Sequence, residues 1–211
     1  MSVERVKNEK TVDDKALNLP PPDLGGQISV AEALQQRRSL RRYQPEGLEL
    51  AQVAQLLWAA QGITNSLGHR TAPSAGGLYP LELYLATGAV AGLEAGLYHY
   101  RPAEHSILRV AAGDLRQALA KACLSQDWIA EAPCILVIAA IFSRTNVRYG
   151  ERTLRYVYME VGAASENIAL QAEALGLGTV MVGAFYELKV QNLLELPEEV
   201  VPLCLMPVGK K

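Results

Sequence analysis

Apolar residues recur every three or four positions in several parts of the chain, and this spacing predicts amphipathic helices. Ser29 and Glu32 form a capping-box signature in front of one short helix. Residues 49–61 keep the same period and stop at Gly62. Residues 151–175 are rich in Ala and Leu and lack proline, so they predict one helix on the order of 35 Å long. Two further helices are expected over residues 114–124 and 188–194.

Alternating or continuous apolar runs between these helices predict strands. Residues 97–101 and 107–110 flank a turn and predict a hairpin. Other strands are expected over residues 81–85, 132–142, 179–182 and 202–208. This order of elements predicts one α+β domain, residues 29–211, with a central mixed sheet flanked by helices. Residues 1–28 are polar and then rich in Pro and Gly, which predicts an extended arm lying on the domain or on a partner chain.

The composition makes several classes of protein improbable. Half of the 211 residues are apolar and a fifth are charged, as in ordinary globular domains. A net charge of −2 gives no global electrostatic case for nucleic acid. The longest apolar run, residues 134–142, is far shorter than the roughly 20 residues of a membrane helix. With no secretory signal and three widely spaced cysteines, the chain is expected to be cytoplasmic, with reduced thiols and a small-molecule substrate.

Arginines crowd the end of the first predicted helix, in the order Arg37, Arg38, Ser39, Leu40, Arg41 and Arg42. Guanidinium groups bind phosphate oxygens bidentately, and a neighbouring hydroxyl adds a charge-assisted hydrogen bond of about 1.5 to 3 kcal/mol. The cluster therefore indicates an anion clamp. The alternative interpretation is that arginines at a helix C-terminus only complement its dipole and stay in water.

A loop of small residues spans residues 70–80, and its centre is Pro73, Ser74, Ala75, Gly76 and Gly77. Small side chains let a backbone approach a flat ligand closely. A serine-hydrolase elbow is excluded because Ala72 stands where that motif needs glycine. The three histidines have no obvious catalytic partner and are interpreted as surface or structural residues.

A second glycine-rich segment covers residues 176–185. It is not a dinucleotide fingerprint, because that motif follows a strand and opens a helix, whereas here a helix precedes the glycines and a strand follows them. Gly176 is a helix stop, and Gly183 with Ala184 forms a tight turn that leaves room for a planar group. Arginines also recur at helical spacing over residues 144–155, and we interpret them as a solvated or intersubunit face.

In combination, these segments resemble the FMN-dependent nitroreductase-like superfamily, and within it the SagB-type dehydrogenases that form thiazoles and oxazoles. The resemblance runs from about residue 19 to residue 209. Its strongest motifs lie in residues 19–22, 37–41 and 70–80, and supporting motifs lie in residues 96–100, 173–178 and 207–210. It implies an α+β homodimer with two FMN sites at the subunit interface.

The resemblance also implies roles for individual residues. Arg37 and Ser39 would contact the FMN phosphate and ribityl chain with Arg38 alongside, and Arg41 would reach the N1 edge of the ring. Residues 73–77 of the other subunit would cover the ring. The opposite face and the N5 edge would be lined by Met181, Val182, Gly183 and Ala184. Lys210 would act as a weak substitute for the basic C-terminal residues of other members. No residue is assigned as a covalent catalyst.

The expected activity is that of an FMN-dependent oxidoreductase, with NAD(P)H delivering hydride to flavin N5 and a nitroaromatic or quinone taking the electrons. One alternative is azoline oxidation in a modified peptide. Azoline-oxidising members are expected to carry a Lys-Tyr pair, whereas this chain has Arg148 with Tyr149 and Arg155 with Tyr156, and arginine is too basic to act as a base. A second alternative is a flavin-binding module without turnover.

Overall fold

The chain forms one seven-stranded sheet with helices on both faces. The computed structural model describes residues 16–211, and residues 1–15 of the expected arm lie outside the described residues. The strands are β1 (Leu17–Asn18), β2 (Leu81–Thr87), β3 (Gly96–Arg101), β4 (Ser106–Ala112), β5 (Cys134–Ile141), β6 (Leu177–Thr179) and β7 (Val200–Lys210). The helices are α1 (Val30–Gln36), α2 (Leu50–Gln61), α3 (Arg116–Ala122), α4 (Phe142–Tyr149), α5 (Thr153–Ala174) and α6 (Glu187–Leu193). Short 3₁₀ turns cover Ala75–Gly77, Asp127–Glu131 and Gly150–Arg152.

The strand order is β1-β4-β3-β2-β5-β7-β6, and each of these neighbouring pairs is antiparallel. The expectation of a mixed sheet therefore needs correction within residues 16–211. Parallel pairing is confined there to two isolated bridges, Ser39 with Thr179 and Leu48 with Val90. The order of helices and strands does not show at which end of the sheet each connection returns. The sequence therefore could not determine whether neighbouring strands run parallel or antiparallel.

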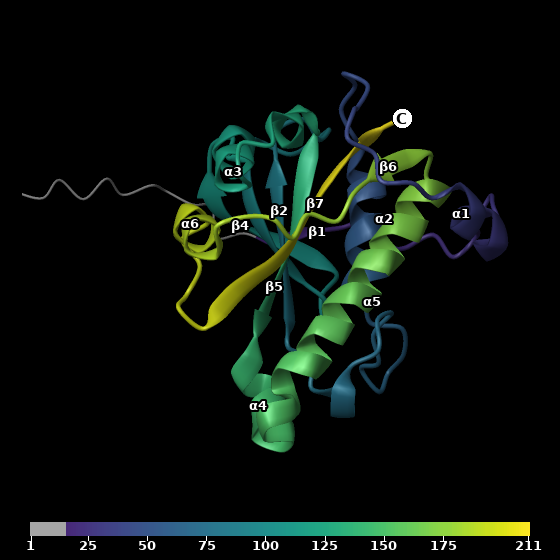
Figure 1. The fold of residues 1–211 in the computed structure, drawn as a ribbon. Coiled ribbons are helices and arrows are strands. Elements are labelled where there is room, and N and C mark those ends of the chain that lie inside the picture. Colours follow the sequence, from purple (N-terminus) through teal and green to yellow (C-terminus); the bar gives the residue numbers. More distant parts are fainter. Residues whose placement is uncertain (1–15) are drawn as a thin grey trace, which may run out of the picture.

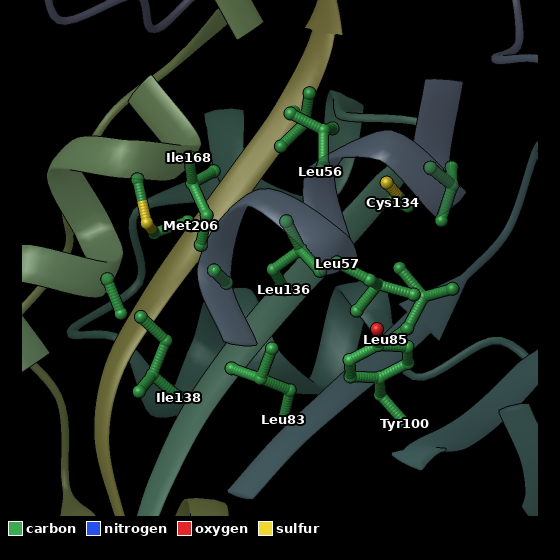
Figure 2. Close-up of a cluster of buried hydrophobic side chains, with 14 of the residues drawn as sticks. Leu56, Leu57, Leu83, Leu85, Tyr100, Cys134, Leu136, Ile138, Ile168 and Met206 are labelled. Carbon is green, nitrogen blue, oxygen red and sulfur yellow. The ribbon is translucent and has the colours of Figure 1, made fainter. Parts of the chain in front are cut away.

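The sheet separates two layers of apolar side chains. Alternate residues of β2 point to opposite faces, as the pleat requires. Leu83 packs on the face covered by α2 and α5, and Tyr84 packs on the face covered by α3 and α6. Figure 2 shows the first layer, where Leu56 and Leu57 of α2 meet Leu136 of β5. Each fully buried Leu contributes roughly 1.5 to 3 kcal/mol of transfer free energy, so β5, buried over most of its length, anchors both layers.

Helix boundaries follow the predicted signals closely. In the capping box, the Ser29 hydroxyl accepts from Glu32 N at 3.2 Å, and the Glu32 carboxylate accepts from Ser29 N at 2.7 Å. Gly62 does end α2, but with an ordinary negative φ; a Cβ there would overlap the Trp58 indole. Among the helices within residues 16–211, not one is long and apolar enough to cross a membrane.

The predicted long helix is present as α5, but the separate helix α4 before it was not expected. The chain turns between them at Gly150, whose φ is +50°. This break divides the arginine stripe, because Arg144 and Arg148 belong to α4 and Arg155 to α5. Figure 1 shows α4 at one end of α5 and α1 near the other. Both candidate site segments described below contact α5, one at Glu160 and the other at Glu166.

The described part of the N-terminal arm lies on its own chain. Leu17 and Asn18 extend the sheet by pairing with β4. Leu19 N then donates to His105 O at 3.0 Å, and Asp23 N donates to the Gln55 side chain at 2.8 Å. Contact of the arm with a partner subunit stays a prediction for residues 1–15.

Candidate functional site

Two glycines hold the arginine segment against the edge of the sheet. Gly178 of β6 and Gly209 of β7 are directly paired across the two strands. A Cβ on Gly178 would overlap the Leu40 side chain, and a Cβ on Gly209 would lie 2.7 Å from the Tyr43 ring. The absent side chains thus leave space in which the segment after Arg37 packs flat on the sheet.

This packing brings Arg37, Ser39 and Met181 together. Leu40 N donates to Thr179 O at 3.0 Å, and Ser39 forms a parallel bridge with the same residue. The three predicted residues line one cavity of about 170 Å³ beside α5. Sequence reasoning placed them on one ligand, and the structure places them around one cavity.

The guanidinium of Arg37 has one weak partner within the described residues. Its Nε lies 3.5 Å from Oε1 of Glu166, and both side chains are substantially exposed. Exposed pairs of this kind contribute about 0 to 1 kcal/mol. A phosphate dianion can therefore replace the carboxylate at little cost. The sequence analysis did not identify Glu166. Its place beside the cavity depends on how α5 packs against the arginine segment, which the sequence alone does not show.

Arg38 and Arg41, two of the other three arginines of the clamp, do not line the cavity. Arg38 Nη1 donates to Gln35 O at 2.9 Å and to Arg37 O at 2.8 Å, so it caps the C-terminal end of α1. The dipole interpretation therefore describes Arg38 in this structure. Arg41 lies 5.9 Å from the centre of the Trp128 ring. An exposed cation–π contact stabilises by about 0.5 to 1 kcal/mol, so Arg41 can leave it for a bound anion.

The predicted glycine turn borders the same cavity at Met181. Met181 is half-exposed, whereas Val182 is buried and pairs with Leu205 through backbone bonds of 2.8 and 3.0 Å. Gly183 and Ala184 follow on the surface, and a Cβ on Gly183 would meet nothing within 4 Å. A strand was expected over residues 179–182, but the observed strand β6 covers only Leu177–Thr179. After it, an isolated bridge pairs Val182 with Leu205.

Lys210 ends β7, with its backbone carbonyl accepting from Gln44 N at 3.0 Å. The neighbouring Lys211 pairs with the buried carboxylate of Glu173. Within residues 16–211, Lys210 is not among the residues that line the cavity, so its role at the phosphate stays a prediction. The backbone bond to Gln44 nevertheless secures the far end of the arginine segment.

The loop of small residues lies elsewhere on the same chain. We call residues 73–77 the ribbon. Ala75 N donates to Glu160 Oε1 at 2.8 Å, and a Cβ on Gly76 would lie 3.0 Å from both Arg148 Nη1 and Tyr149 Oη. The ribbon thus rests on the middle of α5 and on α4.

The ribbon and the arginine cavity use different sides of α5. Their contacts on that helix, Glu160 and Glu166, are six residues apart, which is about 9 Å along the axis and roughly 240° around it. A single chain therefore does not close one cavity from both segments. This is the arrangement expected if the ribbon acts on the cavity of a second subunit.

Tyr79, directly after the ribbon, has a strained backbone with φ of +45°. Three neighbours hold it: Ser74 Oγ accepts from Tyr79 N at 2.8 Å, Arg144 Nη1 donates to Tyr79 O at 3.1 Å, and Arg70 lies 4.5 Å from the ring centre. A non-glycine residue keeps such a conformation only when its surroundings impose it. The loop is therefore built to one shape.

Arg144 connects this loop to a polar cluster on the sheet. Glu82 pairs with Arg144 at 2.6 Å and with His99 at 2.6 Å. Burial alone would raise the pKa of Glu82, but the bonds to His99 and Arg144 outweigh it and lower that pKa. His105 likewise bonds Tyr100 Oη and Pro20 O. These contacts agree with the interpretation of the histidines as structural.

Comparison with known proteins places this fold and site in a class. The Nitroreductase family model matches residues 34–210. Protein MJ1384 of Methanocaldococcus jannaschii, which is named as a nitroreductase, is 46% identical over 190 residues, covering 90% of this chain and 94% of the relative. A Ralstonia eutropha structure titled as a nitroreductase superposes with a TM-score of 0.81 at 31% identity, covering 92% of this chain and 89% of that one.

Two more distant relatives carry informative names. "FMN reductase [NAD(P)H]" of Bacillus subtilis is 26% identical over 196 residues, which is 85% of this chain and 65% of the relative. "Microcin B17-processing protein McbC" of Escherichia coli is 28% identical over 147 residues, which is 66% of this chain and 54% of the relative. The fold and site define an α+β oxidoreductase of the nitroreductase-like class. The chain belongs to the Nitroreductase family.

Proposed function

We propose that this protein is an FMN-dependent oxidoreductase that passes hydride from NAD(P)H to a small planar acceptor such as a nitroaromatic or a quinone. The observation that carries the proposal is the cavity shared by Arg37, Ser39 and Met181. A guanidinium and a hydroxyl at one end suit a phosphate, and the surface turn after Met181 leaves open space for a flat ring. The name of the Bacillus subtilis relative supports the same cofactor and donor.

The residues present fit the phosphate end of FMN within one chain. Arg37 and Ser39 would hold the phosphate and ribityl chain, and residues 181–184 would line the ring. When bound, the flavin supplies a hydride acceptor at N5, and the protein contributes orientation and electrostatics. Arg41 would stabilise negative charge near N1 after leaving Trp128.

A cavity of about 170 Å³ is too small to hold a whole flavin, because ligand pockets usually measure about 300 to 1,000 Å³. We infer that a second copy of the chain completes the site. The exposed face of α5 supports a homodimer: Leu154, Tyr158 and Met159 are 55%, 55% and 62% exposed. Gly162 lies on the same face with nothing within 4 Å of its Cβ position, which permits close approach of another helix. In the dimer, the ribbon of one subunit would cover the flavin held by its partner.

The proposal is tested by the visible spectrum of the purified full-length protein and by NAD(P)H oxidation in the presence of menadione or a nitroaromatic. Yellow protein, or FMN uptake on reconstitution, with acceptor-dependent turnover is the expected result. Arg37→Ala should lose FMN, whereas the exposed Arg101→Ala on β3 should keep it. Failure of the wild type to take up FMN overturns the proposal. Bound FMN without turnover for any acceptor would indicate the flavin-binding module instead.

Azoline oxidation is the second candidate function, and the similarity to McbC favours it. Such a reaction needs a base near the flavin. The pair beside the ribbon is Arg148 with Tyr149, and an arginine does not deprotonate under ordinary conditions. Flavin reduction by an azoline peptide but never by NAD(P)H would establish this candidate and exclude the first.

A further inference from the structure

Glu160 is a buried carboxylate whose presence fold stability does not explain. It lies in the middle of α5 and is 5% exposed. Within residues 16–211 it takes part in no ion pair. The charge of Arg70 favours the ionised carboxyl without forming an ion pair with it. Burying a carboxylate without a direct ion pair is unfavourable, and a glutamine or an apolar residue would be tolerated better at such a place.

The carboxylate is directed at the ribbon. Oε1 accepts from Ala75 N at 2.8 Å, and the neighbouring Ser74 side chain acts to lower the pKa of the carboxyl group. Ser74 Oγ in turn accepts from Tyr79 N at 2.8 Å. One side chain of α5 is therefore bonded to Ala75 and lies beside Ser74, which in turn is bonded to Tyr79, the residue that closes the loop.

The ribbon needs such an external hold. Gly76 and Gly77 have φ of +62° and +66°, and Tyr79 has φ of +45°. The turn's own backbone bonds are Gly77 N to Ser74 O at 3.0 Å and a long one, Leu78 N to Ala75 O at 3.4 Å. Two glycines and one strained residue in five positions have many other conformations available when nothing holds them.

We propose that Glu160 is a positioning residue that keeps the ribbon in the shape needed to cover the flavin. The inference rests on the proposed function, in which the ribbon of one subunit lies over the FMN of the other. Glu160 does not touch the reacting atoms in this view. It acts through Ala75 and Ser74, and its cost to stability is retained because a loose ribbon would leave the flavin uncovered.

The test compares full-length Glu160→Ala and Glu160→Gln with the wild type. Glutamine keeps an acceptor oxygen for Ala75 N, and alanine does not. Val157→Ala is the matched control, because Val157 is fully buried one turn earlier on α5 and lies in the apolar core. It lowers stability without removing a bond to the ribbon.

The first readout is amide hydrogen exchange of peptides covering residues 73–79, without flavin. Glu160→Ala should exchange about tenfold faster or more in that segment, with other segments changed only as much as in Val157→Ala. Glu160→Gln should restore most of the protection. Unchanged exchange of the ribbon in Glu160→Ala, or an equal rise in Val157→Ala, overturns the inference.

The second readout is FMN affinity from quenching of flavin fluorescence. Glu160→Ala should weaken binding about tenfold, Glu160→Gln should lie close to the wild type, and Val157→Ala should leave affinity unchanged. Ribbon loosening with unaltered FMN affinity and unaltered turnover would overturn the positioning role. If the wild type takes up no FMN, the proposed function fails, and the exchange experiment alone decides whether Glu160 holds the ribbon.

Discussion

Gly178 and Gly209 face each other across β6 and β7, and the side chains of Leu40 and Tyr43 occupy the space in front of them. This contact lays the arginine segment on the edge of the sheet. As a result, Arg37 and Ser39 of this segment line one side of the cavity.

Gly178→Ala should therefore weaken FMN binding more than it weakens the fold. The added Cβ overlaps Leu40 and would push Ser39 away from Thr179. Overpacking of this kind costs about 1 to 3 kcal/mol, and we expect at least a tenfold loss of FMN affinity in a fluorescence titration. The double variant Gly178→Ala/Leu40→Ala removes the overlap and should recover part of the affinity. A double variant as weak as the single one would show that Leu40 does not transmit the effect.

Glu166→Gln should strengthen FMN binding. The carboxylate lies 3.5 Å from Arg37 and competes with a phosphate for the guanidinium. Because the pair is exposed, the gain should be modest, up to about fivefold, and it should shrink as salt is raised from 20 to 300 mM, about the range over which screening becomes strong. Equal or weaker binding by Glu166→Gln at low salt contradicts the assignment of Arg37 to the phosphate.

Glu160→Gln should stabilise the fold most at neutral and alkaline pH. Burial raises the pKa of Glu160 above its ordinary value of 4.5, only partly opposed by the bond from Ala75 N, the nearby Ser74 side chain and the charge of Arg70. A raised folded-state pKa means that protonation favours the folded form, so the stability contribution is lost as pH rises through that pKa. The gap in free energy of unfolding between variant and wild type should widen from pH 4 to pH 8 in denaturant titrations. A gap that is independent of pH would show that this carboxyl does not titrate on folding.

Tyr158→Glu should separate subunits and release flavin in the same step. Tyr158 lies half-exposed on the face of α5 that carries Leu154 and Gly162. A charge placed in a helix-to-helix contact costs several kcal/mol when buried without a partner. Sedimentation and flavin absorbance should therefore fall together, whereas Leu188→Glu, on the exposed surface of α6, should change neither. A monomeric Tyr158→Glu that keeps FMN would refute the shared site.

Local signals in the sequence were sufficient for most elements. The capping box at Ser29, the stop at Gly62 and the long apolar helix each depend on neighbours within a few residues, and α5 and its flanking elements agree with them. The α4 helix was missed because its eight residues are mostly polar and its break is a single glycine with a positive φ. Strand direction was equally beyond local reasoning, since it depends on where each connection returns.

The order of motifs along the chain was sufficient by itself to identify an α+β protein of the nitroreductase family, because each motif is a short local run: arginines after a helix, and small residues in a loop. Which of them meet was decided only by the tertiary structure. Arg37 and Ser39 lie beside Met181 because the two paired glycines leave space for Leu40 and Tyr43. Arg38 instead bonds to the end of α1, and Arg41 contacts Trp128. The hydrogen bond from Ala75 N to Glu160 links residues that are 85 positions apart in the sequence. Contacts of that range depend on how the layers pack, and no local pattern encodes them.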